Sequence, residues 1–489
     1  MLDVTAKLPL KDPELFRQAN CIGGAWVQAE SGRTIAVRNP ATGEVIGNVP
    51  ALSAAETRRA IEAAHAALPA WRAMLAKERA VILRKLSDLM LANTDDLAAI
   101  MTAEQGKPLA ESKGEIAYAA SFIEWFAEEG KRVYGETIPQ NAKGRRIIVT
   151  KEPIGVFAAI TPWNFPSAML TRKAAAALAA GCTIVAHPSS HTPLSALALA
   201  ELADRAGLPA GVFNIVVGDA APIAATYCAD TRVRAVSFTG STEIGRIVAR
   251  NAAATVKRVV MELGGHAPLI VFDDADLDRA VAIAIDAKFA TSGQDCLAAN
   301  RVYVQRGLYE HFCAAFAKKV AALRVGAGLE DGVEIGPLMH AAAKRKAEVQ
   351  ISDALARGAK RLTPERAMPG ALFLEPTVLA DVPEEALIMR EETFAPVAAI
   401  SPFDSEDEVV ARANDTEYGL VAYVATRDGA RAARLAKALD YGMVAVNRVK
   451  ITGAPIPFGG MKQSGLGREG SRHGLEAFTD LKYVCLDLN

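Results

Sequence analysis

Apolar residues recur at helical spacing in the first quarter of the chain. Within residues 61–68 and 81–89 they return every three or four positions, which predicts amphipathic helices that continue to about Phe126. Ser53-Ala-Ala-Glu56 has the capping-box pattern expected where the first of these helices begins. The preceding segment, 22–49, combines β-prone and turn residues and predicts short strands.

From Gly155 onward, short apolar runs alternate with helical patterns, and beyond Pro268 a second alternating series begins. Alternation of this kind predicts parallel sheets with helices on both faces, and therefore an α/β protein with two such domains. The first series comprises strands near 156–160, 183–186, 213–217, 235–238 and 257–261, with helices near 167–180, 193–206, 220–229 and 243–254. The second has strands near 301–304, 397–400, 421–425 and 443–446.

Two β-prone segments, 134–138 and 146–150, flank a turn at Gly144 and predict an antiparallel ribbon. A ribbon that projects from a domain needs something to cover its faces, and a second copy of the chain is the natural cover. The β-prone run 481–485 near the C-terminus is expected to be an edge strand donated to a neighbour. We therefore expect a homodimer or homotetramer.

Composition narrows the class of protein. A chain of 489 residues exceeds what one hydrophobic core usually serves, so two or three domains are expected. The net charge of −1 supplies no field for nucleic acid or acidic membranes, and the longest apolar runs are too short to span a bilayer. Six scattered cysteines without a Cys-x-x-Cys pair, and an N-terminus (residues 1–7) without a signal-peptide pattern, favour a cytoplasmic location.

The candidate chemistry centres on Cys296 and Glu262. Cys296 follows Gly293 in a run of small residues, which predicts a turn that exposes its sulfur, and Glu262 ends a β-prone run just before Gly264-Gly265. A nucleophile and a base would thus both lie at the ends of elements, where catalytic groups tend to be. Taken singly, each has a plainer interpretation: the cysteine as a small buried hydrophobe and the glutamate as a solvated loop acid.

A candidate phosphate site follows the fourth strand of the first series. Gly240-Ser241 through Gly245 opens a helix there, so backbone amides and a helix N-terminus could meet a pyrophosphate, although simple turn chemistry explains the same residues. No metal site is predicted, because Pro188 and Pro193 prevent His187 and His191 from sharing a helical face.

Three motifs together resemble the aldehyde dehydrogenase superfamily: Pro162-Trp163-Asn164-Phe165-Pro166, Glu262-Leu263-Gly-Gly and Gly293-Gln-x-Cys296. The resemblance runs from about Trp26 to Cys485 and is strongest with the succinate-semialdehyde dehydrogenase group, as in 457–470. It implies two Rossmann-like doubly wound domains and a small β ribbon. The NAD(P)-binding domain would comprise 1–127 and 149–264, the catalytic domain 265–464, and the oligomerisation segments 128–148 and 465–489.

The resemblance also implies roles for individual residues. Cys296 would attack the aldehyde, Asn164 and the Cys296 N–H would stabilise the oxyanion, and Glu262 would activate the hydrolytic water. Lys173 and Glu469 match positions associated with proton relay. The positions that match cofactor-binding residues are Thr161, Pro162, Trp163, His187, Ser190, Gly240, Ser241, Gly245, Leu263, Glu392 and Phe394, and those that match substrate-binding residues are Phe165, Arg172, Thr452 and Phe458.

Several positions depart from the family pattern. His187 replaces a lysine that binds the adenosine ribose, and Ser190 replaces a glutamate that would repel a 2′-phosphate, so we expect NAD to serve and NADP to be tolerated. Asp295, beside the nucleophile, is expected to point away from the sulfur, because a facing carboxylate would raise the thiol pKa.

The substrate prediction depends on Arg172, which matches the arginine that binds the substrate carboxylate, with an arginine paired to a surface acid as the alternative. The second carboxylate-binding arginine of the group is Ala290 here. We therefore predict a small anionic aldehyde, succinate semialdehyde first, or glutarate semialdehyde or sulfolactaldehyde. The alternatives are a broad-specificity aldehyde dehydrogenase, a relative that transfers the acyl group to coenzyme A, and a binding protein that has kept the fold. The presence of Glu262 disfavours the relative that transfers the acyl group to coenzyme A.

Overall fold

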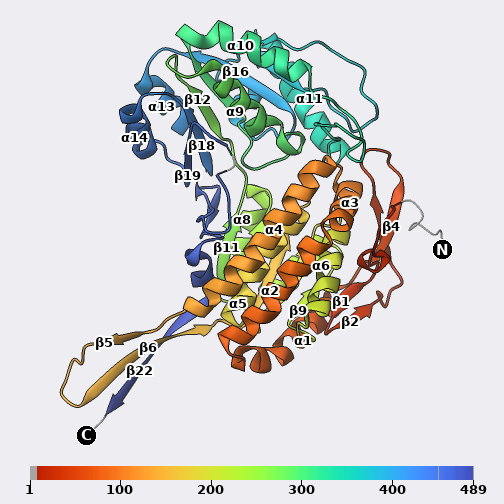
Figure 1. Ribbon diagram of the computed structural model, residues 1–489, viewed down its shortest axis with the longest axis vertical. Helices are drawn as coiled ribbons and strands as arrows, with labels where there is room; N and C mark the ends of the chain where they lie inside the picture. The colour runs from red at the N-terminus through yellow and green to blue at the C-terminus, as the bar shows by residue number, and fades with distance from the viewer. Residues whose placement is uncertain (1–7, 450, 488–489) are drawn as a thin grey trace.

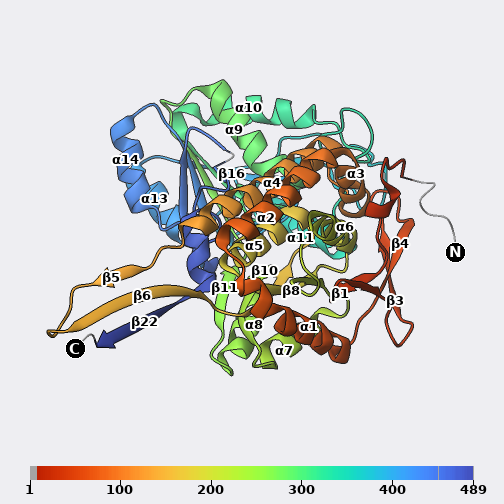
Figure 2. The same cartoon turned by 60° about the horizontal axis from the view of Figure 1, so that its bottom comes forward.

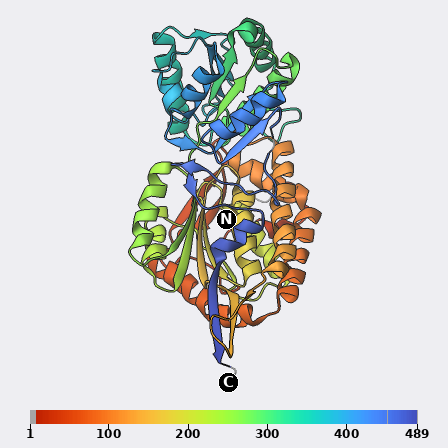
Figure 3. The ribbon, with the colours of Figure 1, turned by 90° about the vertical axis from the view of Figure 1, so that its left-hand side faces the viewer.

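Two large sheets organise the protein, for which a computed structural model describes residues 8–449 and 451–487. Each sheet forms the centre of one lobe, and the lobes are stacked along the long axis of the molecule (Figure 3). This α/β architecture confirms the fold predicted from the sequence. Residues 1–7, where no signal peptide was expected, lie outside the described part of the chain.

The sheet of the first lobe has the order β2-β1-β9-β8-β7-β10-β11-β21. The five strands β9, β8, β7, β10 and β11 are parallel. The two middle strands of the sheet, β8 and β7, are buried at every residue. Its strands are β1 (Asn20–Ile22), β2 (Ala25–Val27), β7 (Val156–Thr161), β8 (Thr183–Pro188), β9 (Phe213–Ile215), β10 (Val233–Thr239), β11 (Arg258–Glu262) and β21 (Gly465–Leu466).

Helices cover both faces of this sheet (Figure 2). Phe157 and Ala159 of β7 pack into the core beneath α5 and α6, whereas Val156 and Ala158 face the core formed with α1, α7 and α8. This alternation follows from the two-residue period of a strand. The helices are α1 (Ala54–Ala73), α2 (Ala76–Ala92), α3 (Thr94–Gln105), α4 (Leu109–Glu129), α5 (Pro166–Ala180), α6 (Pro193–Ala206), α7 (Ala220–Ala229) and α8 (Thr242–Ala253).

The capping box predicted at Ser53 is present. The Ser53 Oγ accepts a hydrogen bond from the Glu56 N–H at 3.3 Å, and the Glu56 carboxylate accepts one from the Ser53 N–H at 2.7 Å. Ahead of it, β3 (Thr34–Arg38) and β4 (Val45–Pro50) form a hairpin, which confirms short strands in this segment.

The second lobe has a seven-stranded sheet of order β14-β15-β16-β13-β12-β18-β19. Its faces are covered by α9 and α10 on one side and by α11 to α14 on the other. The strands are β12 (Pro268–Val271), β13 (Arg301–Gln305), β14 (Lys360–Arg361), β15 (Thr377–Ala380), β16 (Val397–Phe403), β18 (Val421–Ala425) and β19 (Met443–Val446). The helices are α9 (Leu277–Phe289), α10 (Arg306–Ala321), α11 (Ala341–Ala356), α12 (Leu387–Arg390), α13 (Glu406–Asn414) and α14 (Gly429–Ala438).

Short elements complete the chain. The strands β17 and β20 form a small two-stranded sheet, and four 3-10 turns occur among the described residues. Their bounds are β17 (Tyr418–Gly419), β20 (Met461–Lys462), η2 (Pro13–Leu15), η3 (Gly130–Arg132), η4 (Ala290–Gly293) and η5 (Arg472–Phe478).

A three-stranded ribbon projects from the first lobe (Figure 1). It comprises β5 (Glu136–Ile138), β6 (Arg145–Pro153) and β22 (Thr479–Asp487), in the order β22-β6-β5. The C-terminal strand was expected to pair with a neighbour, but it pairs with β6 of its own chain, from Thr479 opposite Pro153 to Asp487 opposite Arg145. The ribbon and its exposed Leu481 and Tyr483 remain a predicted oligomerisation surface.

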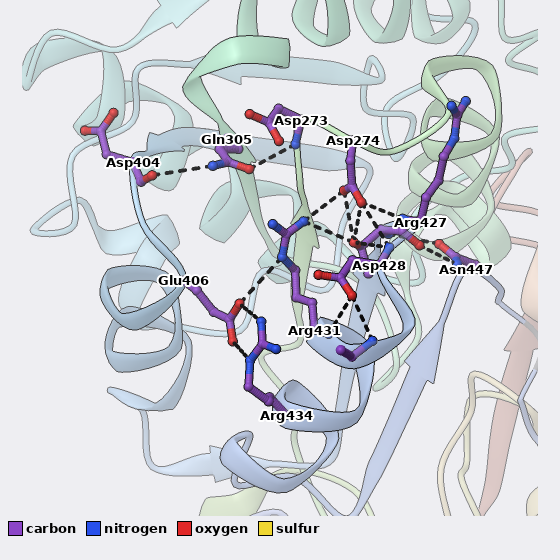
Figure 4. A network of polar contacts seen from close by, with 12 residues as sticks. Asp273, Asp274, Gln305, Asp404, Glu406, Arg427, Asp428, Arg431, Arg434 and Asn447 are labelled. Atoms are coloured by element: carbon purple, nitrogen blue, oxygen red, sulfur yellow. Dashed lines mark hydrogen bonds and ion pairs between the residues drawn. The ribbon is translucent and has the colours of Figure 1, made fainter.

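The carboxyl edge of the second sheet is filled by a polar network (Figure 4). The Asp274 carboxylate, just after β12, accepts hydrogen bonds from the Thr426 hydroxyl, the Arg427 and Asp428 N–H groups and the Arg431 guanidinium, at 2.9–3.0 Å. Ligands of open α/β sheets usually bind at this edge. The Asp274 carboxylate occupies these donors, so they are not available to a ligand.

Candidate active site

A cavity of about 960 Å³ lies between the two lobes. The first lobe contributes the loops that follow β7, β10 and β11, at the carboxyl edge of its sheet, whereas the second contributes segments that precede β13 and β16. Of the residues predicted from the sequence, thirteen line this cavity: Pro162, Trp163, Asn164, Phe165, Arg172, Gly240, Ser241, Leu263, Cys296, Glu392, Phe394, Thr452 and Phe458.

The other predicted residues lie outside the cavity lining. Glu262, Lys173 and Glu469 are buried and interact with one another electrostatically, and Gly245 packs against Leu263. Thr161 is the last residue of β7, and His187 and Ser190 lie at the end of β8 and in the turn after it. The structure thus brings the predicted catalytic residues together and leaves His187 and Ser190 on a separate part of the same sheet edge.

Cys296 lies on a turn, as predicted, but it is only partly exposed. The preceding residues Thr291, Ser292 and Gly293 have φ values of 50°, 57° and 71°, so three successive residues adopt the left-handed conformation. This conformation is costly for the first two, and such strain is retained where surrounding contacts enforce it, often at functional sites.

Contacts from other elements hold this strained loop. The Thr291 N–H donates to the Glu111 carboxylate of α4 at 3.0 Å, the Gly336 N–H donates to the Ser292 Oγ at 2.9 Å, and the Met339 N–H donates to Gln294 Oε1 at 2.9 Å. The Tyr423 hydroxyl donates to the Leu297 carbonyl at 3.0 Å on the other side of Cys296. The nucleophile loop is therefore fixed by both lobes.

The expectation that Asp295 points away from the sulfur is wrong. Burial raises the pKa of the Cys296 thiol well above its ordinary value, and the Asp295 charge raises it further, while Arg172 lowers it. The Asp295 side chain accepts a hydrogen bond from the Leu297 N–H at 2.9 Å, and this contact keeps the carboxylate beside the turn that carries Cys296. Cys296 therefore needs a base to become a thiolate.

Asn164 faces the nucleophile loop. Its side-chain amide donates to the Gln294 carbonyl at 3.0 Å, and its relative exposure is 5%. Asn164 belongs to the loop between β7 and α5, so it also has the turn position that its neighbouring prolines suggested. Its amide is placed where it can donate to an oxygen that develops charge near Cys296.

A layer of buried charges lies behind the cavity wall. The Arg172 Nε donates to the Glu469 carboxylate at 2.6 Å, and the Lys173 ammonium forms an ion pair with the other oxygen of Glu469. Although burial opposes it, these two cations lower the pKa of Glu469. Burial and the Glu469 charge raise the pKa of Glu262 well above its ordinary value. Neither Glu262 oxygen has a hydrogen-bond partner among the described residues.

Arg172 reaches the cavity from α5. Its guanidinium lies 4.0 Å from the centroid of the Phe458 ring, and the residue lines the same cavity as Cys296. An arginine paired with a surface acid was the alternative; the acid is the buried Glu469 instead. Phe458 and Arg172 thus form one wall of the cavity.

Other residues that line the cavity could hold a nicotinamide dinucleotide. Trp163 and Phe394 meet edge to face at 5.6 Å, and Phe394 holds φ at 55°, so a rigid aromatic corner stands beside Leu263. Gly240 and the N-cap residue Ser241 directly precede α8, whose N-terminus offers backbone donors to an anion. A Cβ at Gly240 would lie 2.5 Å from the Phe238 ring, so any other residue at this turn would require that ring to shift.

Glu392 lines the cavity near this corner. Its carboxylate accepts a hydrogen bond from the Gly265 N–H at 2.9 Å, and burial raises its pKa to about 7. His187, at the end of β8, bonds through Nδ1 to the Val216 carbonyl at 2.9 Å, and since a carbonyl only accepts, Nδ1 carries the hydrogen. Burial lowers the pKa of His187, so its ring is neutral at pH 7.

Sequence reasoning missed the residues that support the site from a distance. Glu111 and Tyr423 line the cavity and hold the nucleophile loop, and Lys107 contacts the backbone of Asn164. These residues lie on a helix, on the strand β18 and on a connecting loop, outside the motifs, so no local pattern marks them. Within 8–449 and 451–487, no group of three or more His, Cys, Asp or Glu side chains is arranged to hold a metal ion. No described helix is both long enough and apolar enough to cross a membrane.

Comparisons with known proteins match this architecture. Residues 26–484 match the Aldehyde dehydrogenase family. The chain is 57% identical over 480 residues to a glutarate-semialdehyde dehydrogenase of Pseudomonas aeruginosa, covering 98% of this chain and 99% of the relative. It is 55% identical over 482 residues to a succinate-semialdehyde dehydrogenase [NADP(+)] of Escherichia coli, covering 98% and 100%. The crystal structure of an aldehyde dehydrogenase from Brucella melitensis biovar abortus 2308 superposes with a TM-score of 0.97 at 54% identity, covering 99% of this chain and 100% of that one.

Proposed function

Since this chain belongs to the aldehyde dehydrogenase family, we propose that it oxidises a small anionic semialdehyde to the carboxylic acid with NAD(P), using Cys296 as nucleophile. The observation that carries the substrate class is the position of Arg172. Among the described residues that line the cavity, it is the only lysine or arginine, and it shares that cavity with Cys296 and Asn164. A carboxylate at the far end of a short aldehyde would meet this guanidinium while its carbonyl carbon meets the sulfur.

The acidic residues of the cavity wall do not cancel this preference. Glu111, Asp295 and Glu392 each accept a hydrogen bond from a backbone N–H, and burial raises the pKa of each carboxyl, which reduces the negative charge that opposes a bound anion. Arg172 keeps its charge, because Glu469 raises its pKa although burial opposes this.

In the proposed reaction the Cys296 sulfur forms a bond to the aldehyde carbon as the thiol proton leaves to a base. Asn164 Nδ2 and the Cys296 N–H then donate to the oxyanion of the thiohemiacetal, and loss of such a donor typically costs roughly 3–4 kcal/mol in the barrier. When bound, the nicotinamide supplies the acceptor for the hydride that leaves this carbon. Trp163, Phe394, Leu263 and Glu392 are the residues that would hold it.

Hydrolysis of the resulting thioester is assigned to Glu262. A carboxyl group whose pKa is raised by burial can act as a base near neutral pH, and Glu262 has no competing hydrogen bond among the described residues. Glu262 removes a proton from water, the hydroxyl adds to the thioester carbon, and the carbon–sulfur bond breaks to release the acid and the thiolate. The adjoining Glu469 and Lys173 would pass the proton onward.

We place succinate semialdehyde first and glutarate semialdehyde or a sulfonated analogue such as sulfolactaldehyde next. Ala290, where a second arginine is absent, and Thr452 both line the cavity, which leaves room for a longer or bulkier anion. Relatives named for succinate and for glutarate semialdehyde both support a substrate with a distal carboxylate. For the cofactor, the Escherichia coli relative is named for NADP(+), and we propose use of both NAD and NADP.

The domain roles and the assembly are part of the proposal. The first lobe would bind the dinucleotide, the second would carry the nucleophile, and the ribbon of β5, β6 and β22 would join copies of the chain into a homodimer or homotetramer. The exposed Leu481 and Tyr483 on β22 support this use of the ribbon.

The function is tested with a panel of semialdehydes and uncharged aldehydes, each assayed with NAD and NADP, on the wild type, Cys296→Ala and Glu262→Gln. Cys296→Ala should abolish reduction of the cofactor, whereas Glu262→Gln should give one equivalent of reduced cofactor and stall as a thioester. Normal steady-state turnover in the Glu262 variant would remove this residue from the mechanism. A wild type that prefers uncharged aldehydes would overturn the proposed substrate class.

A further inference from the structure

A buried lysine lies beneath the loop that carries Asn164. The Lys107 ammonium donates to the backbone carbonyl of Asn164 at 2.6 Å and to the Glu115 carboxylate at 2.7 Å, and it lies 4.0 Å from the centroid of the Phe165 ring. The side chains of Lys107 and Glu115 are each only 1% exposed. A fully buried ammonium is costly unless its donors are satisfied, and here two hydrogen bonds and an aromatic face satisfy them.

Glu115 connects this lysine to the start of α5. Its second carboxylate oxygen accepts hydrogen bonds from the Ser167 and Ala168 N–H groups at 2.9 and 3.1 Å, which are otherwise free donors at the N-terminus of the helix. Lys107 and Glu115 therefore fix the end of the Asn164 loop as well as its centre.

A comparison within the same fold shows what the lysine adds. Glu104 of α3 accepts hydrogen bonds from the Leu194 and Ser195 N–H groups at 2.8 Å and so caps α6 as Glu115 caps α5. Within the described part of the chain, Glu104 has no ion-pair partner, and burial raises its pKa to about 8. Helix capping by a buried carboxylate therefore does not require a lysine, and the lysine occurs at the cap whose loop carries Asn164.

The loop that carries Lys107 also contacts the second lobe. A Cβ at Gly336 would lie 2.2 Å from the Gly106 carbonyl, and the Leu109 N–H donates to the Gly328 carbonyl at 2.8 Å. Gly336 in turn bonds to Ser292 of the nucleophile loop. Lys107 thus stands where the first lobe, which carries Asn164, meets the second lobe, which carries Cys296.

We propose that Lys107 is a positioning residue that holds the Asn164 amide in register with the nucleophile loop across the two lobes. The Asn164 side chain already points at that loop, through its bond to the Gln294 carbonyl, and the direction of this side chain depends on a fixed backbone at Asn164. The inference depends on the proposed function, in which Asn164 donates to the oxyanion. A displacement of about 1 Å of such a donor can slow a reaction by roughly a hundredfold.

The test uses Lys107→Met combined with Glu115→Gln. The single change Lys107→Met would leave a buried carboxylate unpaired and could prevent folding, whereas the combined change removes both charges and leaves an amide oxygen to cap α5. The quantity measured is the rate constant of the burst, which is the pre-steady-state formation of reduced cofactor in the first turnover, with succinate semialdehyde as substrate. It is measured in the combined variant, in Asn164→Ala and in the triple variant, with Glu104→Gln as the matched control for a neutralised helix cap.

We expect the combined variant to slow the burst by roughly 10- to 100-fold, with the half-saturating aldehyde concentration changed by less than about threefold. Added to Asn164→Ala, it should slow the burst by no more than about twofold further, because both changes remove the same donor. Glu104→Gln should burst at the wild-type rate. A combined variant with a wild-type burst, or one whose effect multiplies fully with Asn164→Ala, would overturn the positioning role. A wild-type burst in Asn164→Ala would instead overturn the oxyanion role in the proposed function, and the positioning role with it.

Discussion

Arg172→Met tests the substrate class by removing the guanidinium while keeping a side chain of similar length against Phe458. The variant should fold, because Glu469 retains the buried ammonium of Lys173 as its ion-pair partner. A hydrogen bond to a charged group contributes roughly 1.5–3 kcal/mol, so loss of the contact to the substrate carboxylate should lower kcat/KM by roughly 10- to 150-fold.

The structure also shows an effect that every substrate shares. Arg172 lowers the pKa of both Cys296 and Glu262, so its removal should raise both values and slow the reaction of charged and uncharged aldehydes alike. The informative quantity is therefore a ratio: kcat/KM for succinate semialdehyde divided by kcat/KM for butanal, which has the same number of carbons and no carboxylate.

The assay follows absorbance of the reduced cofactor for both aldehydes in the wild type and in the variant. We expect the ratio to fall at least tenfold in Arg172→Met, whatever the common loss. If kcat/KM fell by the same factor for both aldehydes, Arg172 would act only on the charges of the site and not on the substrate carboxylate.

Two further predictions concern the base and the cofactor. Burial and Glu469 raise the pKa of Glu262, and only the ionised carboxylate accepts a proton, so thioester hydrolysis should be slow at acidic pH and accelerate as the pH rises through this raised pKa. Quenched-flow measurement of acyl-enzyme decay at several pH values should show this rise. The same rise in Glu262→Gln would contradict the assignment of Glu262 as the base. Ser190→Glu should lower kcat/KM for NADP at least tenfold more than for NAD, because the new carboxylate would repel the 2′-phosphate of NADP. Two like charges about 4 Å apart near a surface repel by up to roughly 4 kcal/mol. An equal loss with both cofactors would show that this side chain does not face the ribose phosphate.

The local elements of this protein could be predicted from its sequence. The strands and helices of the first series, and four strands of the second, lie close to where hydrophobic periodicity placed them, and the capping box predicted at Ser53 is present. The strands β12, β14 and β15 and the individual helices of the second lobe were not placed from the sequence. Periodicity depends on residues two to four positions apart, which are neighbours in any strand or helix, so the sequence alone contains this information. The same holds for Cys296 on a turn, because the small and flexible residues before it are adjacent in the chain.

Only the tertiary structure determined which residues that lie far apart in the sequence contact one another. Glu469 pairs with Arg172 and Lys173 across almost 300 positions, and β22 pairs with β6 of its own chain. Even for the neighbours Asp295 and Cys296, the effect of the carboxylate on the thiol pKa depends on how the fold buries both residues. A charged side chain indicates that a partner or solvent is needed, but not which of them the fold supplies. The sequence by itself therefore determined most of the local elements and the family motifs that mark the candidate reactive residues. The folded chain determined which charges are buried together, because desolvation and ion pairing depend on every element that surrounds the site.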